Sequence, residues 1–146
     1  SVGYAGGEKN NPSYYEVCSG ITGHAEVVKV VWNVNKIDIS DLLKMFWECH
    51  NPTQKNRQGN DIGTQYRSAI FCTDKDQKIK VEKFIQSIKH LHKNKIVTEV
   101  SVNKNFFNAE NYHMNYFQRN SSTSYCQIII KPKLEKFKKL FKDKYT

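Results

Sequence analysis

The densest group of polar and glycine residues runs from position 58 to 68, immediately before the apolar residues 69–72. Gly59 and Gly63 permit backbone angles and close approaches that other residues resist. The segment also carries several hydrogen-bonding side chains, those of Asn60, Asp61, Gln65 and Tyr66. Because the segment leads into an expected strand, we predict a loop that presents these side chains from a rigid support. The same pattern also fits a hydrated turn between a helix and a strand.

Glu26 is a second candidate for chemistry, because it stands among apolar residues at the start of an expected strand. Burial at this position would disfavour the charged carboxylate and raise its pKa. A carboxyl group that keeps its proton near neutral pH can act as a general acid. The alternative is an exposed carboxylate at a strand end, and the residues alone leave both interpretations open.

The periodicity of apolar residues predicts the elements that position these side chains. We expect strands over 24–34, 66–73 and 96–102, and the end of another strand at 1–4. We expect helices over 38–50, 74–93 and 133–145. Apolar residues alternate onto both faces of 24–34, which predicts a strand covered on both sides. This order of elements predicts one domain, 1–146, folded as a two-layer α+β sandwich with a mixed or antiparallel sheet.

The other segments are expected to be long loops and an irregular C-terminal region. Residues 8–23 are predicted to be a long ordered loop, and residues 106–120 a short helix or a pair of turns. Residues 121–124 are flexible by composition. In the last helix an apolar stripe would lie buried beneath a solvated basic face. The stripe consists of Leu134, Phe137, Leu140 and Phe141.

The net charge of +9 raises the question of a nucleic-acid partner. It arises from 20 Lys and 3 Arg spread along the chain. Because Arg is the residue that reads phosphate and guanine in bidentate geometry, this excess of Lys is a weak signal. We expect no nucleic-acid and no membrane partner, and we keep polyanion binding as a third, weaker hypothesis. With no secretory signal or spanning apolar run in the sequence, we expect a cytoplasmic protein, or an organellar one if a targeting segment precedes Ser1.

The four cysteines lie far apart in the sequence, at Cys18, Cys49, Cys72 and Cys126. No Cys-x-x-Cys pair is present, so we expect neither a bound metal nor a disulfide scaffold. Reduced thiols are the simpler expectation, and one or two of them could be redox-active. Cys49 and Cys72 fall on predicted packed elements and are expected to be inert.

Several sequence words occur together in one order. They are Gly3-Tyr4-Ala5-Gly6-Gly7, Asn11-Pro12-Ser13-Tyr14, Glu16-Val17-Cys18-Ser19-Gly20, Thr22-Gly23-His24-Ala25-Glu26, Phe106-Phe107 with Ala109-Glu110 and Tyr112-His113, and Tyr125-Cys126-Gln127 with Lys131-Pro132-Lys133-Leu134. With the segment 58–68, these words closely resemble the A-type peptide methionine sulfoxide reductases, which return the S epimer of methionine sulfoxide to methionine. The resemblance spans essentially the whole chain. It implies a ferredoxin-like core within the α+β fold.

The resemblance also implies roles for particular residues. Glu26 matches the family's proton donor, while Tyr14 and Tyr66 match the phenols that bind the sulfoxide oxygen. Asp61 would hold a water or orient the substrate. Cys126 matches a second cysteine that resolves a sulfenic acid as a disulfide, which thioredoxin or another dithiol then reduces. No bound cofactor is implied, and the expected substrates are oxidised proteins or free methionine sulfoxide.

Two histidines also lie within family words. His113 is expected to line the substrate site or to brace its loops, and the same holds for His24. We favour bracing for both. Cys18 matches a position of the family pattern that does not carry the nucleophile.

One departure from the family pattern concerns the nucleophile. The family carries it in a Gly-Cys-Phe-Trp-Gly word upstream of the residues that are here Gly3-Tyr4, and no Cys-Phe-Trp occurs in this sequence. We therefore expect an N-terminally incomplete domain that is inactive as it stands. The alternative is a non-catalytic protein that binds methionine sulfoxide on the same fold. A sheet that lacks a member would expose apolar residues near 27–32, so we also expect self-association.

Overall fold

The computed structural model describes residues 1–144. Tyr145 and Thr146, and with them the last position of the helix expected over 133–145, lie outside the described residues. The strands are β1 (Val2–Ala5), β2 (Ala25–Val28), β3 (Arg57–Gln58), β4 (Asp61–Ile62), β5 (Ala69–Cys72), β6 (Glu99–Val102) and β7 (Phe106–Asn108). The α-helices are α1 (Tyr14–Cys18), α2 (Ile39–Cys49), α3 (Lys75–Ile88), α4 (Tyr116–Arg119) and α5 (Lys131–Leu140). Short 3₁₀ turns are η1 (Thr64–Tyr66), η2 (Lys89–Leu91), η3 (Asn111–His113) and η5 (Lys142–Lys144), and η4 (Cys126–Ile130) is a π-helical turn.

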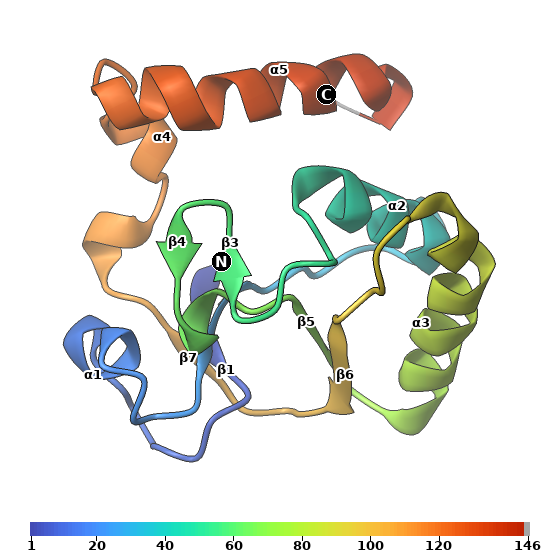
Figure 1. Cartoon of the computed structure of the whole chain (residues 1–146), viewed down its shortest axis with the longest axis horizontal. Coiled ribbons are helices and arrows are strands. Elements are labelled where there is room, and N and C mark those ends of the chain that lie inside the picture. Colours follow the sequence, from blue (N-terminus) through green and yellow to red (C-terminus); the bar gives the residue numbers. More distant parts are fainter. Residues whose placement is uncertain (145–146) are drawn as a thin grey trace.

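Among residues 1–144, the strands form three small sheets, one of which is centred on β1. β1 lies between β2 and β7 and pairs antiparallel with both, so that Tyr4 stands opposite Glu26 on one side and Phe107 on the other. β5 and β6 pair in parallel, and β3 and β4 form a small antiparallel hairpin. This combination of helices with parallel and antiparallel strands confirms the predicted α+β class (Figure 1).

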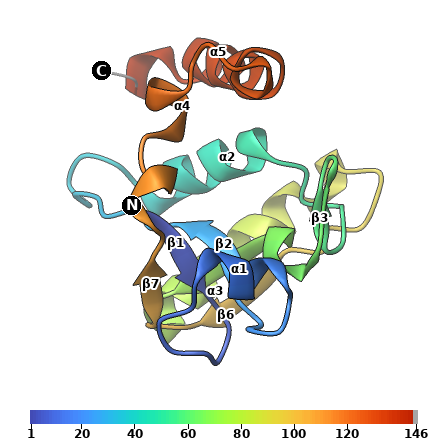
Figure 2. The same ribbon diagram turned by 90° about the vertical axis from the view of Figure 1, so that its left-hand side faces the viewer.

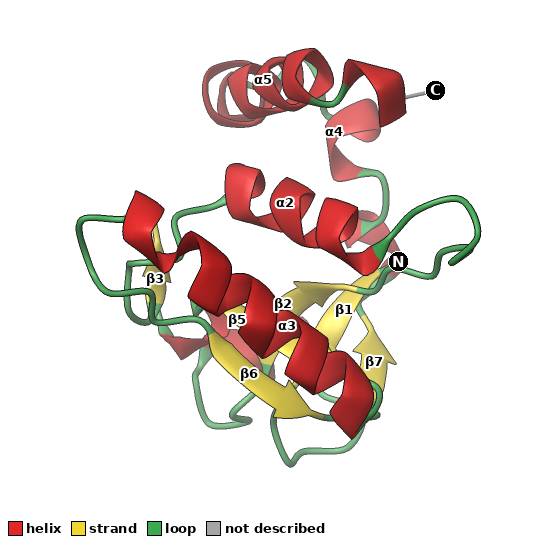
Figure 3. Cartoon of the chain, turned by 90° about the vertical axis from the view of Figure 1, so that its right-hand side faces the viewer, coloured by secondary structure: helices red, strands yellow, loops and turns green. Residues whose placement is uncertain are grey.

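The main core lies where α2 and α3 pack against β5 and β6 (Figure 3). Its buried side chains are Leu43, Trp47, Cys72 and Val81. α2 begins after Asp38, whose carboxylate accepts a hydrogen bond from the backbone N–H of Ser40 at 2.7 Å. A smaller second core places α1 against β1 and β7 through Tyr4, Val17 and Ala109.

The strand predicted over 24–34 is shorter than expected, because β2 ends at Val28. Its partner β1 has only four residues. Beyond Val28 the pairing continues only between Lys29 and Ser1, with the Lys29 N–H donating to the Ser1 carbonyl oxygen at 2.8 Å and the N-terminal ammonium group donating to the Lys29 carbonyl oxygen at 3.2 Å. The prediction that this segment is covered on both sides is also wrong. Val28, Val30 and Val31 are exposed, Val31 to 85%.

Three other segments hold regular structure that was not expected from the sequence. The loop expected over 8–23 contains α1, the loop expected over 58–68 contains β4 and η1, and the segment 106–120 begins with β7. The remaining predicted elements are present, although α5 begins two residues before the expected range and β1 ends one residue after it. β5, β6 and α3 each lie within the ranges expected for them.

The C-terminal region is helical and lies beside α2. α4 leads upward to α5, which runs across the top of the molecule above α2 (Figures 1 and 2). Two ion pairs join α5 and the turn after it to α2, Lys136 with Glu48 and Lys144 with Asp41, each at 3.3 Å. The predicted apolar stripe is only partly buried, because Leu140 is exposed. Within residues 1–144, every helix is too short or too polar to traverse a lipid bilayer.

Candidate active site

Tyr14 is the first residue of α1, and its helix is fixed at the N-terminal end by a capping box. The Ser13 hydroxyl accepts from the Glu16 N–H at 3.3 Å, and the Glu16 carboxylate accepts from the Ser13 N–H at 2.8 Å. Lys9 pairs with the same carboxylate at 2.7 Å. The Tyr14 N–H itself donates to Oε2 of Glu110 at 3.1 Å. The start of α1 is therefore held from two sides.

Glu26 lies in the middle of the β1–β2 pair and contributes to a hollow of about 330 Å³. The hollow is lined by Val2, Gly3, Tyr4, Glu26, Val27, Val28, Ala109 and His113. Glu26 is exposed, as in the alternative of an exposed carboxylate on the strand that the sequence left open. Nevertheless, the surrounding protein desolvates its carboxyl group, and together with the charge of Asp61 this raises its pKa.

Tyr66 ends η1, a turn that is tied to the rest of the site by its neighbours. The Arg67 guanidinium donates to the Gly23 carbonyl oxygen, just before β2, and to Glu99 of β6, each at 2.9 Å. Buried Gln65 donates from Nε2 to the Cys18 carbonyl oxygen at 3.4 Å. Gly63 precedes the turn at φ 148°, where a Cβ would collide with the Gln65 side chain. These contacts place Tyr66 between α1 and β2.

Asp61 lies on the β3–β4 hairpin and is exposed. Burial first, and then the charges of Glu26, Cys18 and Asp61, raise the pKa of Tyr66. The adjacent Cys18 thiol, followed by burial and by Tyr66 and Glu26, raises the pKa of Tyr14. The structure thus brings Glu26 within charge range of Tyr14, Tyr66 and Asp61, and Tyr66 within charge range of Tyr14 and Asp61. Both phenols keep their protons at neutral pH and can donate hydrogen bonds.

His113 and His24 occupy different surroundings. His113 contacts the Tyr14 ring with centroids 4.7 Å apart, and its Nε2 atom is buried without a hydrogen-bond partner among residues 1–144. His24 is buried, accepts at Nδ1 from the Gly7 N–H at 3.0 Å and bonds through Nε2 to the Lys9 carbonyl oxygen at 2.7 Å. His24 therefore braces the loop after β1. A Cβ at Gly7 would lie 2.2 Å from the Thr22 carbonyl oxygen, so this loop packs closely against the segment before β2.

Cys126 is not placed in a mobile loop. Its side chain has 0% exposure, and it begins η4 with its N–H donating to the Thr123 hydroxyl at 3.3 Å. The flexibility expected for residues 121–124 does not extend to Cys126, because the residues after 123 continue as helix into α5. Burial of the small apolar side chain accounts for this placement.

The sequence analysis assigned no site role to Cys18 or Tyr125. Cys18 lies four residues after Tyr14, so the two share one face of α1. Burial, then the charges of Asp61 and Tyr116, raise the pKa of Tyr125, and Glu26 acts in the same direction. Two signals could have found them: the Ser13-x-x-Glu16 capping box, which predicts a helix carrying Tyr14 and Cys18, and the position of Tyr125 next to Cys126.

The arrangement defines the kind of site. A carboxyl group with a raised pKa and two protonated phenols can donate a proton and hydrogen bonds to a neutral oxygen acceptor. Among residues 1–144, no group of three or more His, Cys, Asp or Glu side chains is arranged to hold a metal ion. The donor set therefore suits an organic substrate that carries a polar oxygen.

Comparison with known proteins places the chain in a family. A family model of peptide methionine sulfoxide reductases matches residues 1–145, and the chain belongs to that family. It is 49% identical over 146 residues to the peptide methionine sulfoxide reductase MsrA of Trichodesmium erythraeum, covering 99% of this chain and 82% of the relative. Over 142 residues it is 42% identical to the MsrA of Saccharolobus solfataricus, covering 97% and 80%.

Solved structures agree with this assignment. The crystal structure of Mxr1 from Saccharomyces cerevisiae in reduced form has a TM-score of 0.81 and 37% identity, with 86% of this chain and 72% of that chain covered. Methionine sulfoxide reductase A of Corynebacterium diphtheriae has a TM-score of 0.79 and 34% identity, with 83% and 63% covered. The likeness therefore extends to the three-dimensional fold.

Proposed function

We propose that this protein takes part in the thiol-dependent reduction of methionine-S-sulfoxide, free or within oxidised proteins, to methionine. Family membership supports methionine sulfoxide as the substrate. The observation that carries the proposal is the placement of Glu26 within charge range of Tyr14 and Tyr66. A sulfoxide oxygen is a good hydrogen-bond acceptor and leaves sulfur only when protonated, so it requires this set of donors.

In the proposed reaction, a thiolate attacks the sulfoxide sulfur while Tyr14 and Tyr66 donate hydrogen bonds to the oxygen. Glu26 gives its proton to that oxygen, and Asp61 holds a water or orients the substrate. The attack forms an S–S bond between the thiol sulfur and the substrate sulfur, and the protonated oxygen leaves as the S–O bond breaks. That oxygen then bonds to the thiol sulfur as hydroxide while the S–S bond breaks, so the products are methionine and a sulfenic acid on the attacking thiol. The substrate sulfur is reduced by two electrons, and the thiol sulfur is oxidised by two. His113 lines the same hollow as Glu26 and contacts the Tyr14 ring, and in the proposed reaction it contributes to substrate binding.

Two further thiol steps complete the proposed cycle. We place the nucleophile in a Gly-Cys-Phe-Trp-Gly word N-terminal to Gly3, outside the 146 residues. The Cys126 thiol attacks its sulfenic acid, an S–S bond forms and water leaves. Thioredoxin or another external dithiol then reduces the disulfide, so no bound cofactor is required. Because Cys126 is buried in η4, this step requires residues 124–130 to unwind from their helical conformation.

The test uses two forms of the protein, the 146-residue chain and the same chain extended upstream to include the Gly-Cys-Phe-Trp-Gly word. Each is incubated with dithiothreitol and a peptide containing methionine-S-sulfoxide or the R epimer. We expect turnover of the S epimer by the extended chain and none by the shorter one. An extended chain that does not reduce the S epimer would contradict the proposed function.

A second candidate function is non-catalytic binding of methionine sulfoxide segments. The hydroxyls of Tyr14 and Tyr66 support it, because they can donate hydrogen bonds to a sulfoxide oxygen without any thiol step. It predicts saturable binding of a sulfoxide peptide to the 146-residue chain, and a natural reading frame with a residue other than Cys at the nucleophile position. Titration of the chain with the sulfoxide peptide, followed by NMR, separates the two functions.

A further inference from the structure

The Glu110 carboxylate, half-buried beside α1, accepts three hydrogen bonds from three different segments. The Tyr4 hydroxyl of β1 donates to Oε1 at 3.1 Å. The Tyr14 N–H donates to Oε2 at 3.1 Å, and the Tyr112 hydroxyl of η3 donates to the same oxygen at 2.9 Å. An ionised carboxylate is an acceptor only, so it suits a position at which three donors meet.

These bonds connect Glu110 to the proposed oxygen-binding phenol. The Tyr14 ring lies against His113, at 4.7 Å between centroids, and at 6.4 Å from the Tyr112 ring. The Glu110 carbonyl oxygen also accepts from the His113 N–H at 3.0 Å, which closes the η3 turn. The residue therefore fixes both the backbone that carries Tyr14 and the aromatic rings that surround it.

We propose that Glu110 is a positioning residue, which sets the place of the Tyr14 hydroxyl by holding the first backbone N–H of α1. This role rests on the proposed function, in which Tyr14 binds the sulfoxide oxygen. α1 has only five residues, which is too short for the helix to hold its orientation without contacts to other segments. Its orientation therefore depends on its capping box at one side and on Glu110 at the other.

Local electrostatics agree with an ionised Glu110. Although desolvation alone would raise its pKa, the hydrogen bonds from Tyr112, from the Tyr14 N–H and from Tyr4 outweigh that effect and lower it. Burial, and then the hydrogen bond to Glu110, raise the pKa of Tyr4. The three-donor arrangement is thus stable at neutral pH.

The first test compares Glu110→Ala with the conservative variant Glu110→Gln in the upstream-extended chain. The Gln oxygen can still accept from the Tyr14 N–H, because the Tyr4 hydroxyl can rotate to accept from the amide NH₂. We expect Glu110→Ala to lower kcat/KM for the sulfoxide peptide by about tenfold, and Glu110→Gln to recover most of it. Glu82→Ala is the matched control, since Glu82 forms an exposed pair with Lys78 on α3, at 3.4 Å.

The second test asks whether Glu110 acts through Tyr14. Tyr14→Phe is expected to lower kcat/KM by about a hundredfold, and Glu110→Ala should cost little more in that background. Additive losses, or an unchanged kcat/KM in Glu110→Ala, would overturn the positioning role while leaving the proposed function intact. An unchanged kcat/KM in Tyr14→Phe would overturn both.

The 146-residue chain allows a third measurement that needs no turnover. Hydrogen exchange of the Tyr14 amide should accelerate in Glu110→Ala and stay slow in Glu110→Gln. If Glu110→Ala fails to fold, Glu110→Asp takes its place, because the shorter side chain cannot reach all three donors. An equally protected Tyr14 amide in the substituted chain and the original chain would overturn the proposal.

Discussion

Glu26 experiences two effects that act in the same direction on its carboxyl group. Partial desolvation and the nearby charge of Asp61 both disfavour ionisation, so its pKa lies above the ordinary value. As a proton donor, Glu26 must be protonated. Activity should therefore fall as the pH rises through this raised pKa.

We predict that Glu26→Gln in the upstream-extended chain lowers kcat by about 10²- to 10⁴-fold, the usual contribution of a general acid, with a smaller change in KM. The descending limb of the pH profile on the alkaline side should disappear in the variant. Steady-state rates with the sulfoxide peptide between pH 5 and pH 9 measure both effects. A variant with wild-type kcat would exclude Glu26 as the proton donor.

The same shift predicts a change in stability. A carboxyl group whose pKa is raised on folding contributes stability below its unfolded pKa, and this contribution is lost as the pH rises through the folded pKa. Glu26→Gln should therefore unfold at a higher temperature than the original chain at pH 8, by about 1–3 °C, and the difference should vanish near pH 4. Thermal unfolding of the 146-residue chain at the two pH values is the measurement. A difference that grows towards acid pH would contradict the direction of the shift.

Residue types and positions in the sequence predicted many of the proposed site residues, but not the residues that hold them in place. Glu26 could be selected because a carboxyl group among apolar residues is costly, whereas Tyr14 and Tyr66 could be selected only by resemblance to a family. Glu110 carried no comparable signal. Its importance comes from three donors that are 106, 96 and 2 residues away in the sequence, and such convergence is created by the fold.

At the scale of elements, α1 shows how a local signal fixes a functional side chain. The capping box of Ser13 and Glu16 was present in the sequence, yet the glycines and asparagines around it indicated a loop. The longer α2 and α3 were predictable because their apolar residues recur with helical spacing. The strand over 24–34 was overestimated because strand length depends on the partner strand, which periodicity does not reveal.

We predict that Ser13→Ala destabilises the protein by about 1 kcal/mol through loss of the N-cap and also weakens catalysis, because α1 carries Tyr14. Asp38→Ala is the matched control, since it removes the N-cap of α2, which carries none of the proposed site residues. It should cost similar stability in urea unfolding while leaving kcat/KM of the extended chain close to normal. Equal losses of kcat/KM in the two variants would show that Ser13 acts only through global stability.

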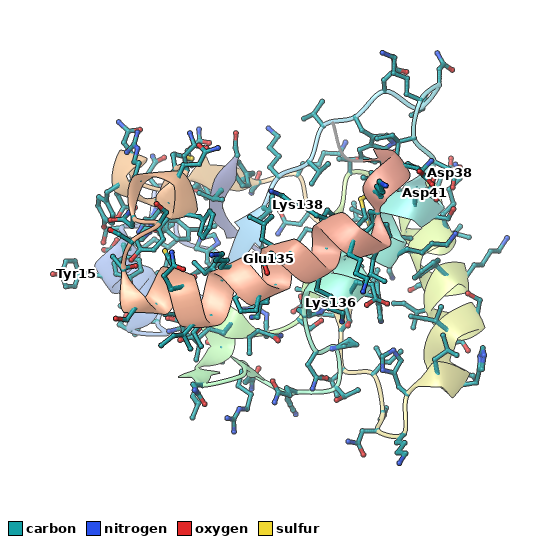
Figure 4. The ribbon with its side chains drawn as sticks, turned by 90° about the horizontal axis from the view of Figure 1, so that it is seen from above. Tyr15, Asp38, Asp41, Glu135, Lys136 and Lys138 are labelled. Carbon is teal, nitrogen blue, oxygen red and sulfur yellow. The ribbon has the colours of Figure 1, made fainter. Side chains whose placement is uncertain are left out.

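At the scale of the whole molecule, the C-terminal helix has a weaker connection to the body than α2 and α3 have to each other. Its ion pairs with α2 are exposed, and such pairs contribute little to stability. Figure 4 shows α5 running over α2, with Lys136 on the helix and Asp41 near its far end. In the same view Tyr15 projects into solvent, and it is 84% exposed, so Tyr15→Phe is a suitable control for substitutions of Tyr14.

Apolar exposure is concentrated beside the edge strand β2. The strand pairs only with β1 within the described residues, and Val28, Val30 and Val31 around its end are exposed to 68%, 53% and 85%. An edge strand with apolar side chains on its accessible surface offers both hydrogen-bonding groups and hydrophobic area to another chain. The isolated chain should therefore associate with itself.

We predict that the 146-residue chain forms dimers or larger species whose fraction rises with concentration. The double variant Val28→Lys with Val31→Lys should shift it to monomer, because charged side chains on an edge oppose strand pairing. Ile79→Lys is the matched control, since it adds a charge at another exposed apolar residue, on α3. Sedimentation velocity over a wide range of concentrations measures the three proteins. A single monomeric species of the original chain across that range would show that this face does not mediate association, and equal effects of the control would show that net charge alone is responsible.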